Sequence, residues 1–546
     1  MMEDQRKIIT EELVKNGYTA FTIDDGIQIT TTIKGISLHL ICRLGAFFPY
    51  EIPSVFLAEE DWDLLPSMPH KYTNGALCTF DKSVVIPNFN EPVQLVVSTI
   101  EKAIDVIRNG IDGNNQVDYM DEFLAYWSTK KGRKAQFFVD DTSVCKDLFW
   151  ITDQSRSIIS DSVEKAKKVF LSALGNEADE CLSGILIPIN GNHSMAIPKT
   201  DLDFIRLIKE NSDCWSRFNS FVQKHINSKQ FFVVASELNK DGEMLFGWCF
   251  KGPGIPNGFR EGHADLALAF IRQKENGRPI AIDNCSQERL FNRGGDGHKI
   301  VIQNATIIGC GSIGSFAAEA LLYYGTTHFS LVDCDKLSYD NIARHYAGYY
   351  WVGEPKVRAI KTEMQLHNPN TVYETFDGNA LQYIEEQYES INNTDILIVS
   401  VGSTPVEHYI LKKINEGIIS VPTLIMWVEP YAFAGHGILI NKPMDVYAEL
   451  YNRKTMEYRY AVLEKPEQYI KREAGCQSSY MPYSSFSLKG MIYRILESCI
   501  NDYYRTGKNY RLTWCGRLSE AKIRGFNINS NYVSMPDYSL EVERLD

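Results

Sequence analysis

A glycine-rich turn between an apolar strand and a helix constrains the fold of this chain more than any other segment. The stretch NATIIGCGSIGSFAAEALLYYG places Gly309, Gly311 and Gly314 in a G-x-G-x-x-G pattern. Glycines permit the tight turn and let the backbone approach a phosphate, which the helix N-terminus attracts. Asp333 ends the next apolar stretch, HFSLVDCD, where a ribose-binding carboxylate is expected. The sequence from Lys299 onward therefore predicts a doubly wound, Rossmann-like sheet that binds a nucleotide.

The turn alone leaves two classes of enzyme open, because NAD- and FAD-dependent dehydrogenases use the same fold. Asn341 and Arg344 follow Asp333, and Lys356 comes shortly afterwards. A dehydrogenase needs few cations near the adenosine half of its cofactor. An enzyme that directs attack on the α-phosphate of ATP must neutralise the triphosphate and the departing pyrophosphate. The cations therefore favour ATP, and ordinary surface charges are the structural alternative.

The segment from Gly309 to Lys356 resembles the adenylation core of the ubiquitin-activating superfamily, of the ThiF/MoeB type. The shared features are the glycine-rich turn, Asp-x-Asp, Asn-x-x-Arg and Gly-x-Pro-Lys. The resemblance implies that ATP is bound together with Mg²⁺. It implies ribose binding by Asp333, and phosphate binding by Asn341, Arg344 and Lys356.

Two neighbouring segments extend or limit this resemblance. RLFNR resembles the segment whose last arginine reaches the ATP of a partner subunit, so Arg293 is expected to act in trans in a homodimer. Ser403 stands near the position where the family carries a magnesium-binding Asp. The ion must then be held by Asp335, or by the phosphates and water. The zinc-binding CxxC pairs of small bacterial relatives are also absent, because the 12 cysteines never have that spacing.

Cys476 is the first candidate nucleophile. It follows a glycine in REAGCQSSYMPYSSFSL, among small and hydroxyl residues that favour an exposed loop, and a structural thiol is the alternative. The pattern GC-x-x-x-x-MPYS resembles bacterial fused activating enzymes, in which the catalytic cysteine lies in a crossover loop after the adenylation core. Lys471 and Arg472 are expected to lower the pKa of this thiol.

Cys78 is the second candidate nucleophile. FFPYEIPSV, then PSMPH, then NGALC resemble the ubiquitin-conjugating fold in the order of their features. The matching positions are Pro49, Pro53, Val55, His70, Gly75 and Cys78. The asparagine of the family's His-Pro-Asn loop, which polarises the oxyanion, is missing, and Asn74 or His70 is the expected substitute. The alternative is a strand-end cysteine in an unrelated domain.

These signals divide the chain into three parts of an α/β multidomain protein. Residues 1–130 are predicted to form a ubiquitin-conjugating-like α+β domain. Residues 131–285 hold a middle α+β module without a chemical signature, entered through the polar segment 128–134 as a linker. Residues 286–546 form the adenylation domain with the cysteine loop.

The fused layout resembles the CD-NTase-associated ubiquitin-transferase-like proteins of bacterial CBASS anti-phage operons. That resemblance implies activation of the C-terminal tail of a cGAS/DncV-like nucleotidyltransferase. The acyl group would pass from Cys476 to Cys78 and then to a lysine of a target protein.

Composition excludes several other classes. The formal charge of −13 leaves no basic excess to neutralise nucleic-acid phosphates. No apolar run reaches membrane-spanning length. The amphipathic, charged first residues are expected to form a helix rather than a signal peptide, and the cysteine usage predicts a reducing cytoplasm. A dehydrogenase, a sulfur-carrier activating enzyme and a non-catalytic scaffold remain as alternatives.

Overall fold

The computed structural model describes most of the chain. The described residues are 2–66, 68–72, 74–80, 88–114, 123–124, 127, 132–152, 156–174, 180–190, 198–225, 228–239, 242–251, 277–445, 449–452, 454–455, 457–472 and 479–545. The chain divides into two compact units. Unit 1 comprises Met1–Lys167 and Ala178–Cys285, and unit 2 comprises Lys168–Glu177 and Ser286–Asp546.

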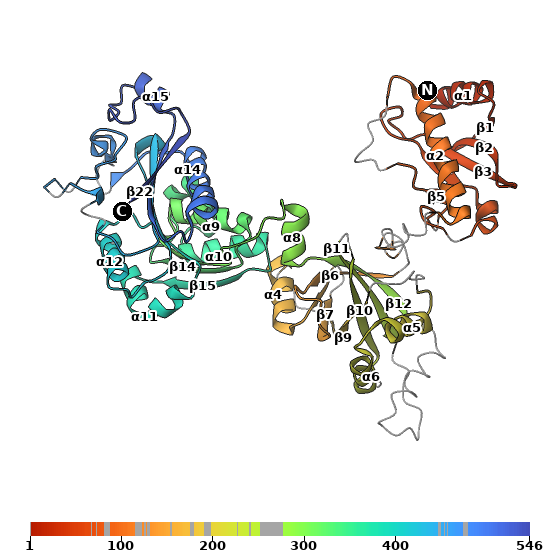
Figure 1. Ribbon diagram of the computed structural model, residues 1–546, viewed down its shortest axis with the longest axis horizontal. Helices are drawn as coiled ribbons and strands as arrows, with labels where there is room; N and C mark the ends of the chain where they lie inside the picture. The colour runs from red at the N-terminus through yellow and green to blue at the C-terminus, as the bar shows by residue number, and fades with distance from the viewer. Residues whose placement is uncertain are drawn as a thin grey trace. The chain divides into compact units, whose positions relative to one another are not determined.

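Unit 1 begins with a helix, an antiparallel sheet and a second helix, as the ubiquitin-conjugating resemblance predicts (Figure 1). The elements are α1 (Met2–Lys15), β1 (Thr19–Ile23), β2 (Gly26–Ile33), β3 (Ile36–Arg43), β4 (Ser54–Leu57), η1 (Glu59–Leu64), β5 (Ala76–Leu77) and α2 (Pro92–Asp112). Alternate strand residues such as Ile29 and Leu40 are buried in one cluster with Ile100 and Ile107 of α2. Apolar residues that recur every second position in the strands and about every 3.6 positions in α2 thus pack into one core.

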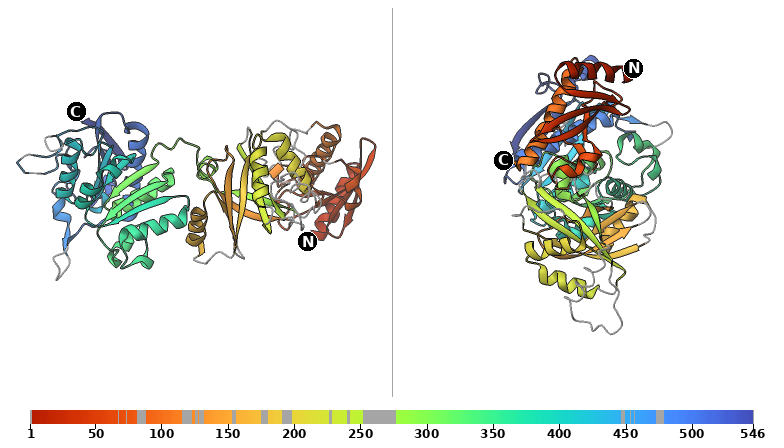
Figure 2. Two further views of the ribbon diagram at one scale, coloured as in Figure 1. Left: turned by 90° about the horizontal axis from the view of Figure 1, so that it is seen from below. Right: turned by 90° about the vertical axis from the view of Figure 1, so that its right-hand side faces the viewer.

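The rest of unit 1 contains a closed barrel of seven strands in the order β10-β11-β12-β6-β8-β7-β9 (Figure 2). The strands are β6 (Arg133–Phe138), β7 (Lys146–Thr152), β8 (Ser157–Ser160), β9 (Glu180–Pro188), β10 (Gln230–Asn239), β11 (Gly242–Lys251) and β12 (Arg278–Asn284). Helices α5 (Asp201–Asn211) and α6 (Trp215–Lys224) share an apolar cluster with barrel residues. The middle module is therefore α+β, as expected, and its strands close on themselves.

The predicted linker at 128–134 needs correction at its ends. Arg133 and Lys134 already belong to β6, because the alternate residues Ala135 and Phe137 point into the barrel core. Trp127, just before the segment, is buried in the same module and donates its indole N–H to the carbonyl of Ile280 at 2.8 Å.

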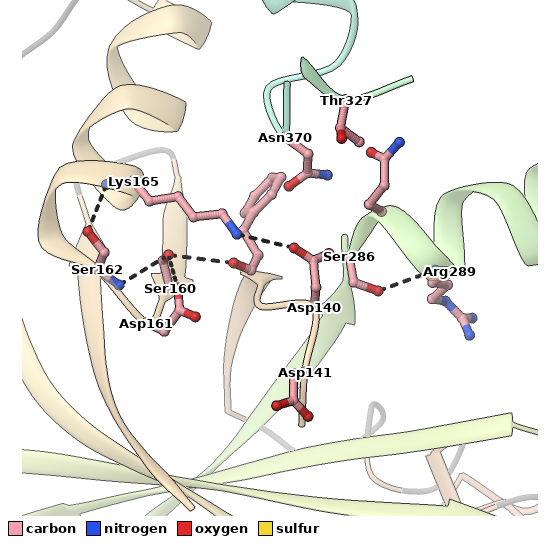
Figure 3. A network of polar contacts seen from close by, with 12 residues as sticks. Asp140, Asp141, Ser160, Asp161, Ser162, Lys165, Ser286, Arg289, Thr327 and Asn370 are labelled. Atoms are coloured by element: carbon pink, nitrogen blue, oxygen red, sulfur yellow. Dashed lines mark hydrogen bonds and ion pairs between the residues drawn. The ribbon is translucent and has the colours of Figure 1, made fainter. Parts of the chain in front are cut away.

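A polar network fixes the start of α4 (Val163–Leu174) after β8 (Figure 3). The backbone N–H of Lys165 donates to the Ser162 hydroxyl at 3.3 Å, and the Ser162 N–H donates to Ser160 Oγ at 3.5 Å. The Lys165 ammonium lies 3.5 Å from an Asp140 carboxylate oxygen. These contacts attach the first turn of α4 to the ends of β6 and β8.

Unit 2 is built on one eight-stranded sheet in the order β15-β14-β13-β16-β17-β18-β21-β22. The strands are β13 (Asn304–Ile308), β14 (His328–Asp333), β15 (Val372–Asp377), β16 (Ile396–Val399), β17 (Thr423–Val428), β18 (Ala434–Ile440), β21 (Asn509–Cys515) and β22 (Ser539–Leu545). The first five strands in this order are parallel, as predicted, and the last three pair antiparallel. The strand order reverses between β13 and β16, where ligands bind in open α/β sheets.

Helices cover both faces of the sheet in unit 2 (Figure 1). One face is covered by α9 (Ser312–Tyr324), α10 (Lys356–His367) and α14 (Ser485–Ser498). The other is covered by α11 (Ala380–Asn392) and α12 (Thr404–Asn415). Ile307 and Ile308 are buried on opposite faces of β13. A strand buried on both sides reads as a continuous apolar run, which explains the sequence pattern.

No helix among the described residues is both long and apolar enough to cross a membrane.

Candidate active site

The glycine-rich turn lies at the carboxyl end of β13. Gly309 has φ +89°, and a Cβ there would lie 2.8 Å from the Ser400 backbone. A Cβ on Gly314 would lie 1.8 Å from the Gly309 carbonyl oxygen. A Cβ on Gly311, which precedes α9, would meet no described atom within 4 Å. Two glycines therefore serve close packing, and the third leaves the N-terminus of α9 open to an anion.

Asp333, the last residue of β14, holds the turn. Its carboxylate accepts the Cys310 N–H at 2.6 Å and the Asp335 N–H at 2.8 Å. Because both bonds come from backbone N–H groups, the carboxylate is fixed beside the glycine-rich turn. The position agrees with the predicted role of Asp333 on a ribose, and that role stays a prediction.

Lys356 brings a partly shielded positive charge to the same place. It begins α10, its side chain is only 10% exposed, and its ammonium lies 2.7 Å from Asp335 and 4.0 Å from Asp333. A buried ammonium is costly unless paired, so these carboxylates compensate it. Asp335 is 65% exposed and can therefore be solvated when an anion pairs with Lys356 instead.

Arg344 ends the 3-10 helix η2 (Tyr339–Arg344) and turns toward the segment that follows the predicted cysteine loop. Its guanidinium donates to the carbonyl of Met481 at 3.3 Å and lies 5.3 Å from the ring centroid of Tyr483. The Tyr483 hydroxyl donates to Ser312 Oγ at 3.1 Å, at the first residue of α9. Arg344 is thereby connected to the N-terminus of α9.

Asn341 lies in the same 3-10 helix as Arg344. Its side-chain oxygen accepts the Ser338 N–H at 3.1 Å. That bond fixes the amide, and the predicted role of Asn341 on a phosphate stays a prediction.

Arg293 is not brought into this cluster. It lies exposed near the end of α8 (Gln287–Gly294), a helix whose start is capped by Ser286 Oγ, which accepts the Arg289 N–H at 3.3 Å (Figure 3). Within the described part of the chain its guanidinium makes no hydrogen bond or ion pair. This exposure is compatible with the predicted action in trans, which stays a prediction.

Ser403 occupies the N-cap position of α12 but does not cap it with its side chain. Ser400 is the serine that contacts the turn, where its hydroxyl donates to the Gly309 carbonyl at 2.8 Å. Asp333, Cys334 and Asp335 present their ligand atoms within 4.8 Å of one another. Mg²⁺ prefers carboxylate oxygen to thiol sulfur, so only the two aspartates of this group suit it.

His345 is a site residue that sequence reasoning missed. It is buried, its Nδ1 accepts the Ala347 N–H at 3.0 Å, and its Nε2 donates to the Cys310 carbonyl at 2.9 Å. Burial lowers its pKa, so the ring is neutral and braces the turn. Its place directly after Arg344 is the one sequence signal that could have suggested a role.

Neither cysteine near the turn is prepared for nucleophilic attack. Burial, with the nearby Asp333 carboxylate, raises the pKa of the Cys310 thiol well above its usual value. Burial also raises the pKa of Cys334, and the carboxylates of Asp335 and Asp333 add to the effect. A thiol that stays protonated is a poor nucleophile. The candidate nucleophiles therefore remain Cys78 and Cys476, whose roles stay predictions.

Cys78 lies directly after β5, beside His70. The Cys78 N–H donates to the His70 carbonyl at 2.9 Å, and His70 has φ +64°. A Cβ on Gly75, which has φ +80°, would lie 2.6 Å from the indole nitrogen of Trp62, so glycine is required there. The structure thus brings together three of the predicted positions: His70, Gly75 and Cys78.

The side chain of Asn74, the other predicted substitute, makes its contact within its own turn. It is exposed at the tip of the turn, and its side-chain oxygen accepts the Ala76 N–H at 3.2 Å. The amide therefore closes its own turn. Of the two predicted substitutes for the missing asparagine, His70 is the residue that lies alongside Cys78.

Cys476 lies outside the described residues, so its predicted role is not tested. On either side of this position, β19 (Lys471–Arg472) pairs antiparallel with β20 (Ser479–Tyr480). The pairing brings the two ends of the cysteine segment together. The predicted influence of Lys471 and Arg472 on the thiol stays a prediction.

Family comparisons agree with both halves of this description. The Prokaryotic E2 family B matches residues 13–136, and the ThiF family matches residues 287–465. The chain joins an E2-type domain to a ThiF-type adenylation domain. The predicted fold class and the predicted resemblance to fused activating and conjugating proteins are thereby confirmed.

The chain is also similar to individual proteins. The ATP-dependent ubiquitin transferase-like protein Cap2 of Pseudomonas aeruginosa is 21% identical over 467 residues, which cover 80% of this chain and 79% of that protein. Cap2 of Enterobacter hormaechei is 27% identical over 125 residues, covering 23% of this chain and 21% of that protein. A crystal structure of Escherichia coli MccB is 16% identical, with 42% and 63% coverage and a TM-score of 0.30.

The chain is therefore an activating and conjugating enzyme that joins an E2-type domain to a ThiF-type domain. A sulfur-carrier activating enzyme would not need the E2-type domain, and a dehydrogenase would need neither that domain nor the cations beyond Asp333. These two alternatives lose their support, as does a scaffold without catalysis.

Proposed function

We propose that this enzyme adenylates the C-terminal carboxylate of a cGAS/DncV-like nucleotidyltransferase and joins it to a lysine of a target protein, in anti-phage defence in the cytoplasm. One observation carries the proposal. The buried Lys356 ammonium lies beside the Asp333 carboxylate that holds the glycine-rich turn, and the Arg344 guanidinium contacts the ring of Tyr483, whose hydroxyl donates to Ser312 at the start of α9. The same chain carries an E2-type match over residues 13–136, which include Cys78.

The first step uses ATP as a substrate. The partner's carboxylate attacks the α-phosphorus of ATP, and the bond from that phosphorus to the oxygen bridging it to the β-phosphate breaks. Pyrophosphate departs, and the product that remains bound is an acyl-adenylate. Negative charge moves onto the pyrophosphate, and Lys356 and Arg344 stabilise it electrostatically. The N–H groups at the start of α9 bind a phosphate, and Asp333 accepts hydrogen bonds from the ribose.

Mg²⁺ would neutralise part of the triphosphate charge when it is bound with ATP. Asp335 is the carboxylate suited to bind this ion, because its side chain is exposed and only its ion pair with Lys356 would have to break.

The next steps move the acyl group between thiols. The Cys476 thiolate attacks the acyl carbon and releases AMP, which leaves a thioester. The Cys78 thiolate then attacks the thioester carbonyl and Cys476 departs as a thiolate. A target amine attacks the second thioester, an amide forms, and Cys78 is released. Covalent linkage of the two domains raises the effective concentration of one thiol at the other.

The proposal includes a homodimer in which Arg293 of each chain serves the ATP of its partner. The exposure of Arg293 at the end of α8 supports this. A cation supplied in trans would add to the charge stabilisation given by Lys356 and Arg344.

The deciding experiment is an ATP-dependent adduct assay. The full chain is incubated with ATP, Mg²⁺ and a candidate nucleotidyltransferase, and the products are separated on non-reducing gels. We expect an adduct that is lost with reductant, and a second product that resists reductant when a target is present. The control is the same partner without its last residues. Adducts that form without ATP, or with the truncated partner, would contradict the proposal.

A further inference from the structure

Tyr483 links two parts of the candidate nucleotide site. Its ring lies 5.3 Å from the Arg344 guanidinium carbon, and its hydroxyl donates to Ser312 Oγ at 3.1 Å. Arg344 also donates to the carbonyl of Met481, two residues before Tyr483. One short segment therefore contacts both the arginine and the first residue of α9.

This segment is itself well anchored. The Pro482 carbonyl accepts the Tyr431 N–H at 2.5 Å. Ser484 caps α14 by accepting the Phe486 N–H at 3.2 Å. Helix α14 packs against α9, where Lys489 pairs with Glu319 at 2.7 Å. Tyr483 is thus held between a fixed backbone contact and the start of a buried helix.

The position of an arginine at a phosphate site depends on such supports. The Arg side chain has several rotatable bonds, and ordering it on binding costs conformational entropy. A guanidinium stacked on an aromatic face and bonded to a carbonyl has lost much of that freedom beforehand. Tyr483 and Met481 supply these two contacts to Arg344.

The hydroxyl of Tyr483 affects a second donor. Because Tyr483 donates to Ser312 Oγ, the Ser312 hydroxyl acts as acceptor in this bond and keeps its own proton for another partner. Ser312 is the first residue of α9 and follows Gly311, where the surface is open. An anion at this helix N-terminus would therefore accept a hydrogen bond from the Ser312 hydroxyl.

We propose that Tyr483 is a positioning residue for ATP: its ring orients Arg344, and its hydroxyl orients Ser312 toward a phosphate. This inference rests on the proposed function, because it takes Arg344 to contact the triphosphate. It goes further by giving a role to the Met-Pro-Tyr-Ser segment that follows the predicted cysteine loop. The support that Arg344 receives comes from that segment.

The test measures ATP binding to the full chain by calorimetry, with Mg²⁺ and without an acyl acceptor. Tyr483→Phe keeps the ring and removes the hydroxyl, so we expect the Kd for ATP to rise about threefold. Tyr483→Leu removes both contacts, and we expect a rise of about tenfold or more. Tyr388→Phe, which alters an exposed tyrosine on α11, is the matched control and should leave the Kd unchanged.

A double-mutant cycle separates positioning from a general effect on structure. If the hydroxyl acts through Ser312, Tyr483→Phe should change nothing further in a Ser312→Ala background. Additive effects, or a Tyr483→Leu chain that binds ATP as tightly as the wild type, would overturn the inference. If Tyr483→Leu fails to fold, the phenylalanine variant and its cycle decide. A wild-type chain that does not bind ATP would instead refute the proposed function itself.

Discussion

Arg344 is the residue whose charge is most directly open to test, because no carboxylate neutralises it among the described residues. Its contacts are a carbonyl and an aromatic ring. We predict that Arg344→Ala lowers partner-dependent pyrophosphate exchange about 100-fold or more, the usual loss when a preorganised charge-stabilising group is removed. Exchange of labelled pyrophosphate into ATP measures this.

Arg358→Ala is the matched control for that variant. Arg358 lies on α10 close to the site, is largely exposed and, in the part of the chain that the structure describes, pairs with Glu354 alone, at 3.4 Å. A surface pair of this kind contributes little, so exchange should stay near the wild-type rate. Equal losses in both variants would assign the effect to general charge rather than to a position at the triphosphate.

The two candidate cysteines make separable predictions. If the acyl group passes from the adenylate to Cys476 and then to Cys78, Cys476→Ala should accumulate acyl-adenylate and form no thioester. Cys78→Ala should trap a reducible thioester at Cys476 and yield no amide. Intact-mass measurements before and after reduction distinguish these species. A Cys476→Ala chain that still loads Cys78 from ATP would remove Cys476 from the pathway.

Local sequence predicted the residues whose partners are close along the chain. Asp333, Asp335 and Lys356 belong to one motif, and the structure brings them into contact. Ser312 and Tyr483 meet from distant segments, so no periodicity or spacing could have linked them. His345 was missed for a related reason. Its bond to the Cys310 carbonyl exists only after β13 and β14 are paired.

At the scale of elements, a buried carboxylate fastens the segment before the predicted cysteine loop to the sheet. Glu429, after β17, accepts the N–H groups of Val462 and Leu463, each at 2.8 Å. The same carboxylate lies 2.7 Å from Nε2 of the buried His436 on β18. A carboxylate has two acceptor oxygens and can bind several N–H groups, whereas the amide of a glutamine has a single acceptor oxygen.

We predict that Glu429→Gln loosens this anchor without unfolding unit 2. The amides of Val462 and Leu463 should exchange with deuterium about tenfold faster or more, because a buried acceptor has been weakened. Hydrogen exchange read by mass spectrometry on peptides from this segment measures the change. Glu416→Gln, which removes one partner of an exposed ion pair with Lys412, is the control and should leave the exchange rate of these amides unchanged. Unchanged exchange in the first variant would show that the apolar contacts of Val462 and Leu463 suffice.

The elements themselves were predicted to different degrees. The parallel half of the sheet followed from buried apolar runs joined by helices, and Ile307 and Ile308 illustrate why such runs are continuous. The antiparallel strands β18, β21 and β22 carry no comparable signal, because their pairing depends on long connections. Closure of the barrel was also missed. It depends on β6 pairing with β12 across more than a hundred residues.

At the scale of the whole molecule, the proposed transfer from Cys476 to Cys78 takes place between two domains of one chain, so its rate should be independent of protein concentration. Activation of the carboxylate by ATP would still depend on formation of the dimer if Arg293 acts on a partner subunit. Dilution should then reduce pyrophosphate exchange per chain, while an already loaded thioester continues to transfer.

Mixing two defective chains tests this assembly. A chain with Arg293→Ala keeps its own nucleotide residues but cannot serve a partner, and a chain with Arg344→Ala has the opposite defect. Arg344 is preferable to Asp333 as the second position, because Asp333 accepts two backbone N–H groups and its loss would disturb the turn.

A mixed dimer holds one complete site out of two. Random exchange of subunits should therefore restore about a quarter of the wild-type pyrophosphate exchange, since half of the dimers are mixed. Each chain alone should remain inactive, and Arg289→Ala, on the same helix, should behave like the wild type. Full activity in a strictly monomeric protein would exclude a trans role, and Arg293 would then be an ordinary exposed residue at the end of α8.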